Sequence, residues 1–137
     1  MSEKPHTIVS EVMTTRIVSI EATATVHDAT RLMREQQTSS VIVNRRDASD
    51  EFGLVVVSDI ASKVLALNLS PKRVNVYEIM SKPVITVARE MNVVYAMRLL
   101  SRFQLSRALV IDHDRNPLGI VTLRDMVLRN IQDVEAE

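Results

Sequence analysis

The chain has 137 residues, of which 46% are hydrophobic and 25% charged, and its 17 Lys plus Arg are balanced by 17 Asp plus Glu. This size predicts one compact domain or two small half-domains that share a core. Zero net charge excludes the broad basic surface of a nucleic-acid-binding protein, and the absence of Cys excludes disulfides and thiolate metal sites. No apolar stretch has signal-peptide or membrane-spanning length, so we expect a cytoplasmic protein without membrane contact.

An internal repeat organises the chain. Met13 has a counterpart in Met80, 67 positions later, and the β-branched run at 17–20 recurs at 84–87 with the same offset. Gly53 then matches Gly119, 66 positions later. Ordered matches at a nearly constant offset indicate two copies of one structural unit, which differ by one residue in a loop.

Each copy predicts the order strand, helix, strand, strand, helix. In the first copy, the run at 17–20 predicts a strand, and Thr25 begins a helix with apolar residues at 26, 29 and 33. Continuous apolar runs at 41–43 and 54–57 predict buried strands. Asp59 stands just before the next helix, where we expect it to be the N-cap.

The second copy repeats these elements after a break at Ser70-Pro71. Its helix has a clearer apolar stripe at 93, 96, 97 and 100, and Asp125 is the expected N-cap of its last helix. We expect the strands to bury a common set of side chains: Val18, Val43, Val55, Ile85, Val110 and Val121.

Three segments together resemble the cystathionine-β-synthase (CBS) repeat: residues 12–14 with 79–81, residues 106–110, and residues 119–125. The resemblance covers about residues 8–131. It implies an α/β fold of two βαββα repeats, 8–70 and 71–131, related by a pseudo-twofold axis and forming one Bateman module. It also implies a stand-alone regulatory module that binds AMP, ADP, ATP or S-adenosylmethionine in a cleft between the repeats, as a regulatory ligand and not as a catalytic cofactor.

The same resemblance assigns the residues of that cleft. Asp125 can accept hydrogen bonds from ribose hydroxyls, and Thr122 can donate to a phosphate oxygen. Arg107 is placed near the phosphate, with Arg124 as a weaker candidate. The adenine side is expected from four residues of the first repeat: Thr14, Ile17, Val18 and Ser19.

The first repeat departs from the pattern, because Val56 stands where the second repeat has Thr122. Its cleft, predicted from Asp59, Ser81, Val84 and Thr86, therefore lacks a phosphate-side hydroxyl and is expected to bind more weakly. Residues 44–46 add positive charge nearby or form a solvated loop.

No constellation for catalysis or metal binding is evident, so we expect no enzyme. His6, His27 and His113 share no metal-ligand spacing, and the run 112–114 is typical of a polar turn. The alternative function is a structural dimerisation module with vestigial clefts. Surplus apolar residues at 60–67 and 126–131, among them Leu65, Val127 and Leu128, predict a homodimer, and a regulated protein in trans is a further expected partner.

Overall fold

The computed structural model describes residues 6–136, which divide into two compact units. One unit is continuous in sequence and comprises residues 18–84; we call it the contiguous unit. The other combines the N-terminal segment up to Ile17 with residues 85–136; we call it the composite unit. The predicted α/β class is confirmed, and each unit has its own three-stranded sheet.

The contiguous unit contains β1 (Ser19–Ile20), α1 (Val26–Gln36), β2 (Ser40–Val43), β3 (Gly53–Val56) and α2 (Val57–Ile60). A π-helical turn, Ala61–Leu65, continues α2, and a 3-10 turn, Val76–Glu78, follows. Strand β1 pairs with β2 in parallel and β2 with β3 antiparallel, as expected for a crossover helix followed by a hairpin. The strand predicted at 54–57 ends at Val56, one residue earlier than expected, because Val57 begins α2.

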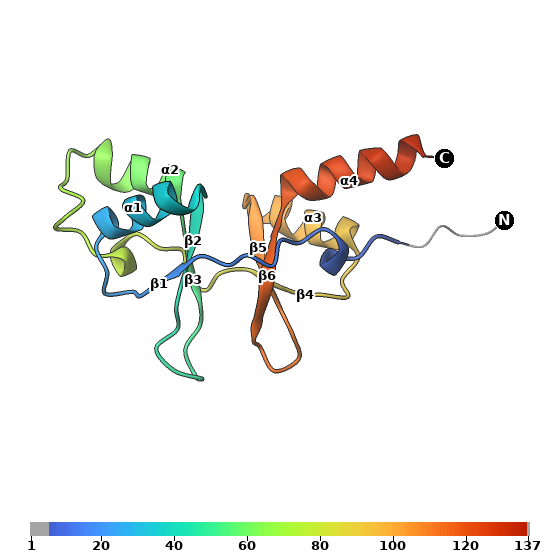
Figure 1. Ribbon diagram of the computed structural model, residues 1–137, viewed down its shortest axis with the longest axis horizontal. Helices are drawn as coiled ribbons and strands as arrows, with labels where there is room; N and C mark the ends of the chain where they lie inside the picture. Colours follow the sequence, from blue (N-terminus) through green and yellow to red (C-terminus); the bar gives the residue numbers. More distant parts are fainter. Residues whose placement is uncertain (1–5, 137) are drawn as a thin grey trace. The chain divides into compact units, whose positions relative to one another are not determined.

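The composite unit repeats the arrangement with β4 (Thr86–Ala88), α3 (Val93–Arg102), β5 (Arg107–Ile111), β6 (Pro117–Thr122) and α4 (Leu123–Glu135). A 3-10 turn, Val9–Glu11, precedes them in the chain. Figure 1 shows the β5–β6 hairpin turn at the opposite end of this unit from α4. The first turn of α4 therefore lies where β6 ends, and this is the location of the predicted site.

The helices begin where side-chain caps satisfy their free backbone N–H groups. Thr25 accepts from the N–H of Asp28 as predicted, and Asn92 accepts from the N–H of Val94. The prediction that Asp59 and Asp125 are N-caps is wrong, because the cap positions are Val56 and Thr122. Both aspartates lie in the first turn instead, where a negative charge also favours the helix dipole.

Each unit packs its helices against its own sheet. In the composite unit, Ala96 and Leu100 of α3 and Met126 of α4 join Val110 and Val121 in one buried cluster. Four of the six predicted core residues are buried: Val43, Val55, Val110 and Val121. Val18 and Ile85 are only partly buried, because each lies just before its strand begins at the margin of the core.

Each unit includes a segment that comes, in sequence, just before the first strand of the other unit. The composite unit includes the residues up to Ile17, before β1, and the contiguous unit includes the residues up to Val84, before β4. Thr14 and Ile120 exchange two backbone hydrogen bonds of 2.9 Å within the composite unit. Ser81 and Leu54 make the equivalent pair in the contiguous unit. The repeats predicted as 8–70 and 71–131 divide the sequence in two. The compact units differ from them, because each unit includes a segment that the prediction assigns to the other repeat.

Candidate functional site

The predicted Thr122 and Asp125 lie together in the first turn of α4. Thr122 Oγ1 accepts a hydrogen bond from the backbone N–H of Asp125 at 3.1 Å. The hydroxyl hydrogen of Thr122 therefore remains available to donate to a ligand. The Asp125 side chain is 42% exposed, and its charged neighbour Arg124 lies 3.6 Å away. This turn thus presents one hydroxyl donor and one accessible carboxylate.

Arg107 stands beside this turn. It is paired directly with Thr122 in the antiparallel register of β5 and β6, so both residues lie at the same level of the sheet. Partial burial lowers the pKa of the Arg107 guanidinium, while the charge of Asp125 acts in the opposite direction. The strand register therefore brings a partly desolvated cation, a hydroxyl and a carboxylate into one neighbourhood.

The N-terminal segment supplies the remaining predicted residues of the composite unit. Thr14 is held against β6 by its hydrogen bonds to Ile120, and its side-chain oxygen accepts from the backbone N–H of Arg16 at 3.3 Å. Ile17 ends this segment. Of the seven residues predicted for the main site, five belong to the composite unit, whereas Val18 and Ser19 belong to the contiguous unit.

The equivalent position of the contiguous unit has different chemistry. Val56 pairs with Ser40 in the register where Thr122 pairs with Arg107. Ser40 is 8% exposed, so this neighbourhood contains neither the exposed hydroxyl nor the guanidinium. Ser40 was not singled out from the sequence. The repeat offset nevertheless aligns Ser40–Val43 with Arg107–Val110, and this alignment places Ser40 at the position of Arg107.

Asp59, the counterpart of Asp125, is already engaged within the contiguous unit. One of its oxygens accepts from the backbone N–H of Val56 at 3.2 Å, and the other lies 3.5 Å from Lys63 Nζ. Lys63 Nζ also donates to the carbonyl of Ile79 at 3.1 Å. The Asp59 side chain is only 18% exposed. Lys63 was not predicted, although a Lys four residues after Asp59 is the spacing of a helical ion pair.

The other residues predicted for the weaker site are distributed between the units. Ser81 is hydrogen bonded to Leu54 in the contiguous unit, and Val84 is buried there with its N–H donating to the carbonyl of Phe52 at 2.9 Å. Thr86 belongs to β4 of the composite unit. The structure therefore brings together Asp59, Ser81 and Val84 in one unit but places Thr86 in the other.

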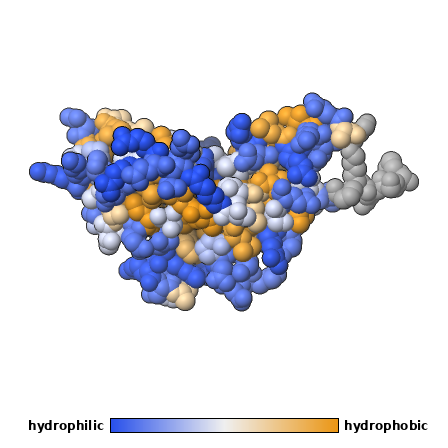
Figure 2. All heavy atoms as spheres, viewed as in Figure 1, coloured by the Kyte–Doolittle hydropathy of each residue, from blue (hydrophilic) through white to orange (hydrophobic). Residues whose placement is uncertain are grey.

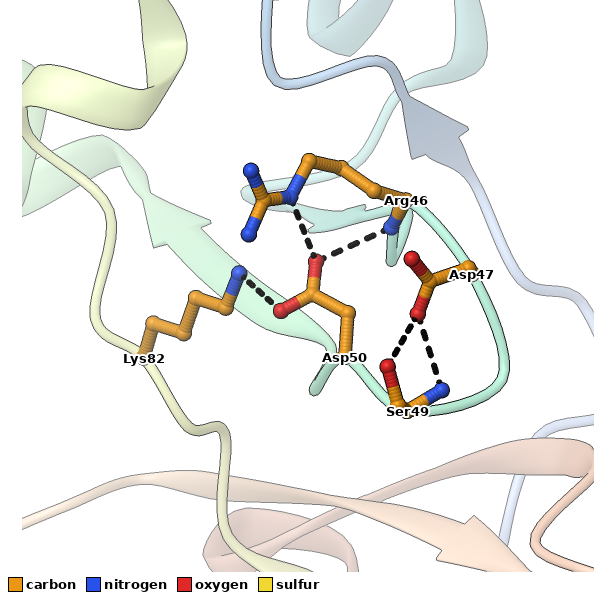
Figure 3. Close-up of polar contacts among 5 residues, drawn as sticks. All are labelled: Arg46, Asp47, Ser49, Asp50 and Lys82. Carbon is orange, nitrogen blue, oxygen red and sulfur yellow. Dashed lines mark hydrogen bonds and ion pairs between the residues drawn. The ribbon is translucent and has the colours of Figure 1, made fainter.

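A polar cluster fixes the segment that carries Ser81. Asp50, in the loop between β2 and β3, lies between Lys82 and Arg46 (Figure 3), with Lys82 Nζ at 2.7 Å and the backbone N–H of Arg46 at 2.9 Å. The Asp50 side chain is 12% exposed. The hydrogen bond from Lys82 and the backbone hydrogen bond from Arg46 hold the pKa of Asp50 far below its usual value. Arg46, predicted as phosphate-side charge or solvated loop, is thus partly committed to Asp50.

Asp50→Asn is expected to lower the free energy of unfolding at neutral pH. A carboxyl group whose folded pKa is depressed stabilises the protein above its unfolded pKa of about 4, and this contribution is lost as the pH falls through the folded pKa. The difference from wild type should therefore shrink below about pH 4 in urea titrations followed by circular dichroism. Lys82→Met should behave alike, and a pH-independent difference would contradict the role of the ion pair.

The polar groups elsewhere in residues 6–136 form no metal-binding cluster. Within residues 6–136, no three His, Asp or Glu side chains are placed to hold a metal ion. His113 Nε2 lies 3.9 Å from Glu90, and Asp112 accepts hydrogen bonds from its own turn. Among the described helices, none has the length and apolar character needed to cross a bilayer.

Comparison with known proteins identifies the repeats. The family model described as "CBS domain" matches residues 9–66 and 76–129. Among curated proteins, the uncharacterised protein MK0525 of Methanopyrus kandleri is 32% identical over 120 residues, which cover 87% of this chain and 60% of that protein. The chain spans 60% or less of the length of the curated relatives it matches.

Two solved structures are also similar. The hexameric CBS-CP12 protein from bloom-forming cyanobacteria has a TM-score of 0.86 and 38% identity, covering 90% of this chain and 68% of that one. The CBS domain of a bacterial CNNM/CorC family Mg²⁺ transporter, solved in complex with ATP, has a TM-score of 0.75 and 30% identity, covering 91% and 87% respectively.

Proposed function

Because this chain belongs to the CBS-domain family, a family of regulatory modules, we propose that it is a sensor of an adenosine-containing ligand: AMP, ADP, ATP or S-adenosylmethionine. The ligand binds at the composite unit, on the neighbourhood formed by Thr14, Ile17, Arg107, Thr122 and Asp125. The protein has no catalytic activity of its own, and it acts in the cytoplasm on a regulated partner in trans.

The observation that carries this proposal is the meeting of three chemistries at the end of β6. Asp125 offers an accessible carboxylate for ribose hydroxyls, Thr122 a hydroxyl donor, and Arg107 a cation paired with Thr122 across two strands. The positive end of the α4 dipole also lies at this turn and favours an anion. The ATP complex of the similar transporter domain supports the same ligand class.

The test is mass spectrometry of small molecules released from the gently purified protein, followed by calorimetric titration. We expect an adenosine compound in the released fraction and saturable binding of at least one of the four candidates. If neither is observed with folded protein, the sensor function is wrong. A ligand that binds can regulate only if it favours one arrangement of the protein, with typical coupling of about 1–3 kcal/mol.

An exposed apolar surface supports the proposed homodimer. Figure 2 shows apolar side chains gathered over α4. The exposed apolar residues of this helix, which we call the α4 face, are Val127, Leu128, Ile131 and Val134. Leu65 is also exposed, in the contiguous unit. Contiguous apolar surface of this kind is typical of an interface, and the similar cyanobacterial protein is described as hexameric.

We expect light scattering at micromolar concentration to give twice the mass of 15.4 kDa. Leu128→Glu should shift the protein toward monomer, because a buried carboxylate without a partner opposes association. Gln132→Glu, at an exposed position of the same helix outside the α4 face, adds the same charge and is the matched control. A monomeric wild type would contradict the homodimer.

The alternative, a dimerisation module with vestigial sites, fits the contiguous unit better than the composite unit. There Val56 and Ser40 replace Thr122 and Arg107, and Asp59 is engaged by Lys63. An assembled protein that releases no small molecule and binds none would favour this function for the whole chain.

A further inference from the structure

We propose that the exposed side of α3 is the docking surface for an acidic, partly apolar segment of the regulated protein. We call this surface the α3 face and define it by four residues: Tyr95, Arg98, Arg102 and Phe103. The inference rests on the proposed function, which expects a regulated protein in trans, and adds the chemistry by which that protein is recognised.

The α3 face lies on the side of the helix that does not pack against the sheet. The buried residues of α3 are Val93, Ala96 and Leu100. Arg98 and Arg102 follow Tyr95 by three and seven positions, the spacing of one helical face, and both arginines are exposed. Tyr95 is 59% exposed and Phe103 54%. Tyrosine and arginine are the residue types that contribute most to binding at protein interfaces, so this face has the composition of a contact surface.

The α3 face is positively charged, and its charge is not balanced by neighbouring groups. The helix contains two arginines and no Asp or Glu. Within residues 6–136, neither Arg98 nor Arg102 forms an ion pair with a carboxylate. The guanidinium of Arg98 lies over the ring of Tyr95, 5.4 Å from its centroid. Such stacking uses the face of the guanidinium and leaves its edge, which carries the N–H donors, for a carboxylate.

The equivalent face of the contiguous unit has different chemistry. At the repeat offset, Asp28 of α1 stands at the position of Tyr95, and Glu35 stands at the position of Arg102. Arg31 pairs with Glu35 at 3.8 Å. Helix α1 therefore balances its own charges and presents no aromatic residue. Because both helices form in the same place in the repeat, the fold does not require the aromatic and basic residues of the α3 face.

An acidic protein segment fits the α3 face better than a second copy of the chain or a nucleic acid. A symmetric contact through α3 would bring the arginines of two copies together with no carboxylate on either helix. A nucleic-acid-binding protein has a broad basic surface, whereas this chain has no net charge. A segment in which carboxylates flank an apolar side chain offers hydrogen-bond acceptors to the guanidiniums and apolar contact to Tyr95 and Phe103.

The test is fluorescence anisotropy with a labelled synthetic peptide of repeated Glu-Glu-Leu units, compared with a Gln-Gln-Leu peptide of the same length. We expect only the acidic peptide to bind wild type, with an affinity that falls as salt is raised, because exposed charges are screened. The double variant Arg98→Gln, Arg102→Gln should bind it about tenfold more weakly. The matched control is Arg31→Gln, Arg34→Gln on α1, which removes the same charge and should bind as wild type does.

Three results would overturn the docking surface: no binding of the acidic peptide to wild type, an equal loss of affinity in the α1 control, or tighter binding of a single-stranded oligonucleotide than of the peptide. A smaller mass of the α3 double variant than of wild type in light scattering would assign the α3 face to an interface between copies, and would also overturn it. Circular dichroism of both double variants checks that they are folded.

Calorimetric titration with the adenosine candidates separates this inference from the sensor function. We expect the α3 double variant to bind the nucleotide as wild type does. If the nucleotide binds but the acidic peptide does not, the docking surface is wrong and the sensor function stands. If the peptide binds to a folded protein that binds none of the four candidates, the sensor function is wrong and the docking surface stands.

Discussion

Replacing Asp125 with alanine is expected to abolish the tighter adenine-nucleotide binding event while leaving the fold intact. Its carboxylate is expected to accept two hydrogen bonds from ribose, and each bond to a charged acceptor contributes about 1.5–3 kcal/mol. The affinity for the nucleotide should therefore fall roughly a hundredfold or more. Within the part of the chain that the structure describes, the same carboxylate lies 3.6 Å from Arg124 and interacts with the charge of Arg107. The cap of α4 is kept, because Thr122 accepts from the backbone of residue 125.

Asp59→Ala should show the opposite result. The Asp59 carboxylate is mostly buried, accepts from Val56 N–H and pairs with Lys63. Its loss is expected to lower the free energy of unfolding by about 1 kcal/mol and to spare the tighter binding event. Calorimetry and thermal unfolding of both variants, with Asp125→Asn as a conservative control, measure the two effects separately. If Asp59→Ala is the more damaging change for binding, the working site belongs to the contiguous unit.

Gly119→Ala is expected to have the largest effect on stability. A Cβ at this position would meet the backbone carbonyl oxygen of Thr14 more closely than Cβ contacts occur in proteins, and Met13 Sδ at 3.0 Å. Backbone held by two hydrogen bonds to Ile120 cannot move without losing them. Overpacking of this kind costs about 2 kcal/mol, which lowers the melting temperature by roughly 5–10 °C in a chain of this size.

Gly53→Ala is the matched control. There the added Cβ would meet Met80 Sδ at 2.8 Å and Val43 Cβ at 3.3 Å, so the main obstacle is a flexible thioether. We expect less than half the destabilisation of Gly119→Ala, by thermal unfolding followed with circular dichroism. Because Thr14 lies in the proposed site, Gly119→Ala should also weaken AMP binding. Equal melting temperatures for the two variants would contradict this account of the close approach.

The elements themselves were predictable because their signals are local. The helix beginning after Thr25 combines a capping residue with apolar residues at helical spacing, and the structure confirms it. The short, β-branched runs indicated strands but not their ends: β1 contains only the last two residues of the run at 17–20. Asp59 and Asp125 were predicted at the correct helix starts but as N-caps, whereas both lie three residues after the cap. Aspartate is common at both positions, so composition alone does not separate them.

The assembly of the units was not predictable in the same way. The pairing of Thr14 with Ile120 joins residues far apart in the chain, and no periodicity encodes it. The spacing of Asp59 and Lys63 is a local signal, but the hydrogen bond from Lys63 Nζ to the carbonyl of Ile79 joins residues that no local pattern relates. Likewise, the replacement of Arg107 by Ser40 became informative only when the strand register placed each opposite its partner.

The interleaving of the chain has a consequence for its biosynthesis. The contiguous unit has all its residues once Val84 has left the ribosome, so it can fold during translation. The composite unit cannot: the strand β6 that receives Thr14 is made near the end of synthesis. Its N-terminal segment must therefore wait, unpaired, until a long loop closes, a step that slows folding. A chain that stalls after Val84 but before β6 would carry a finished contiguous unit and lack the proposed nucleotide site.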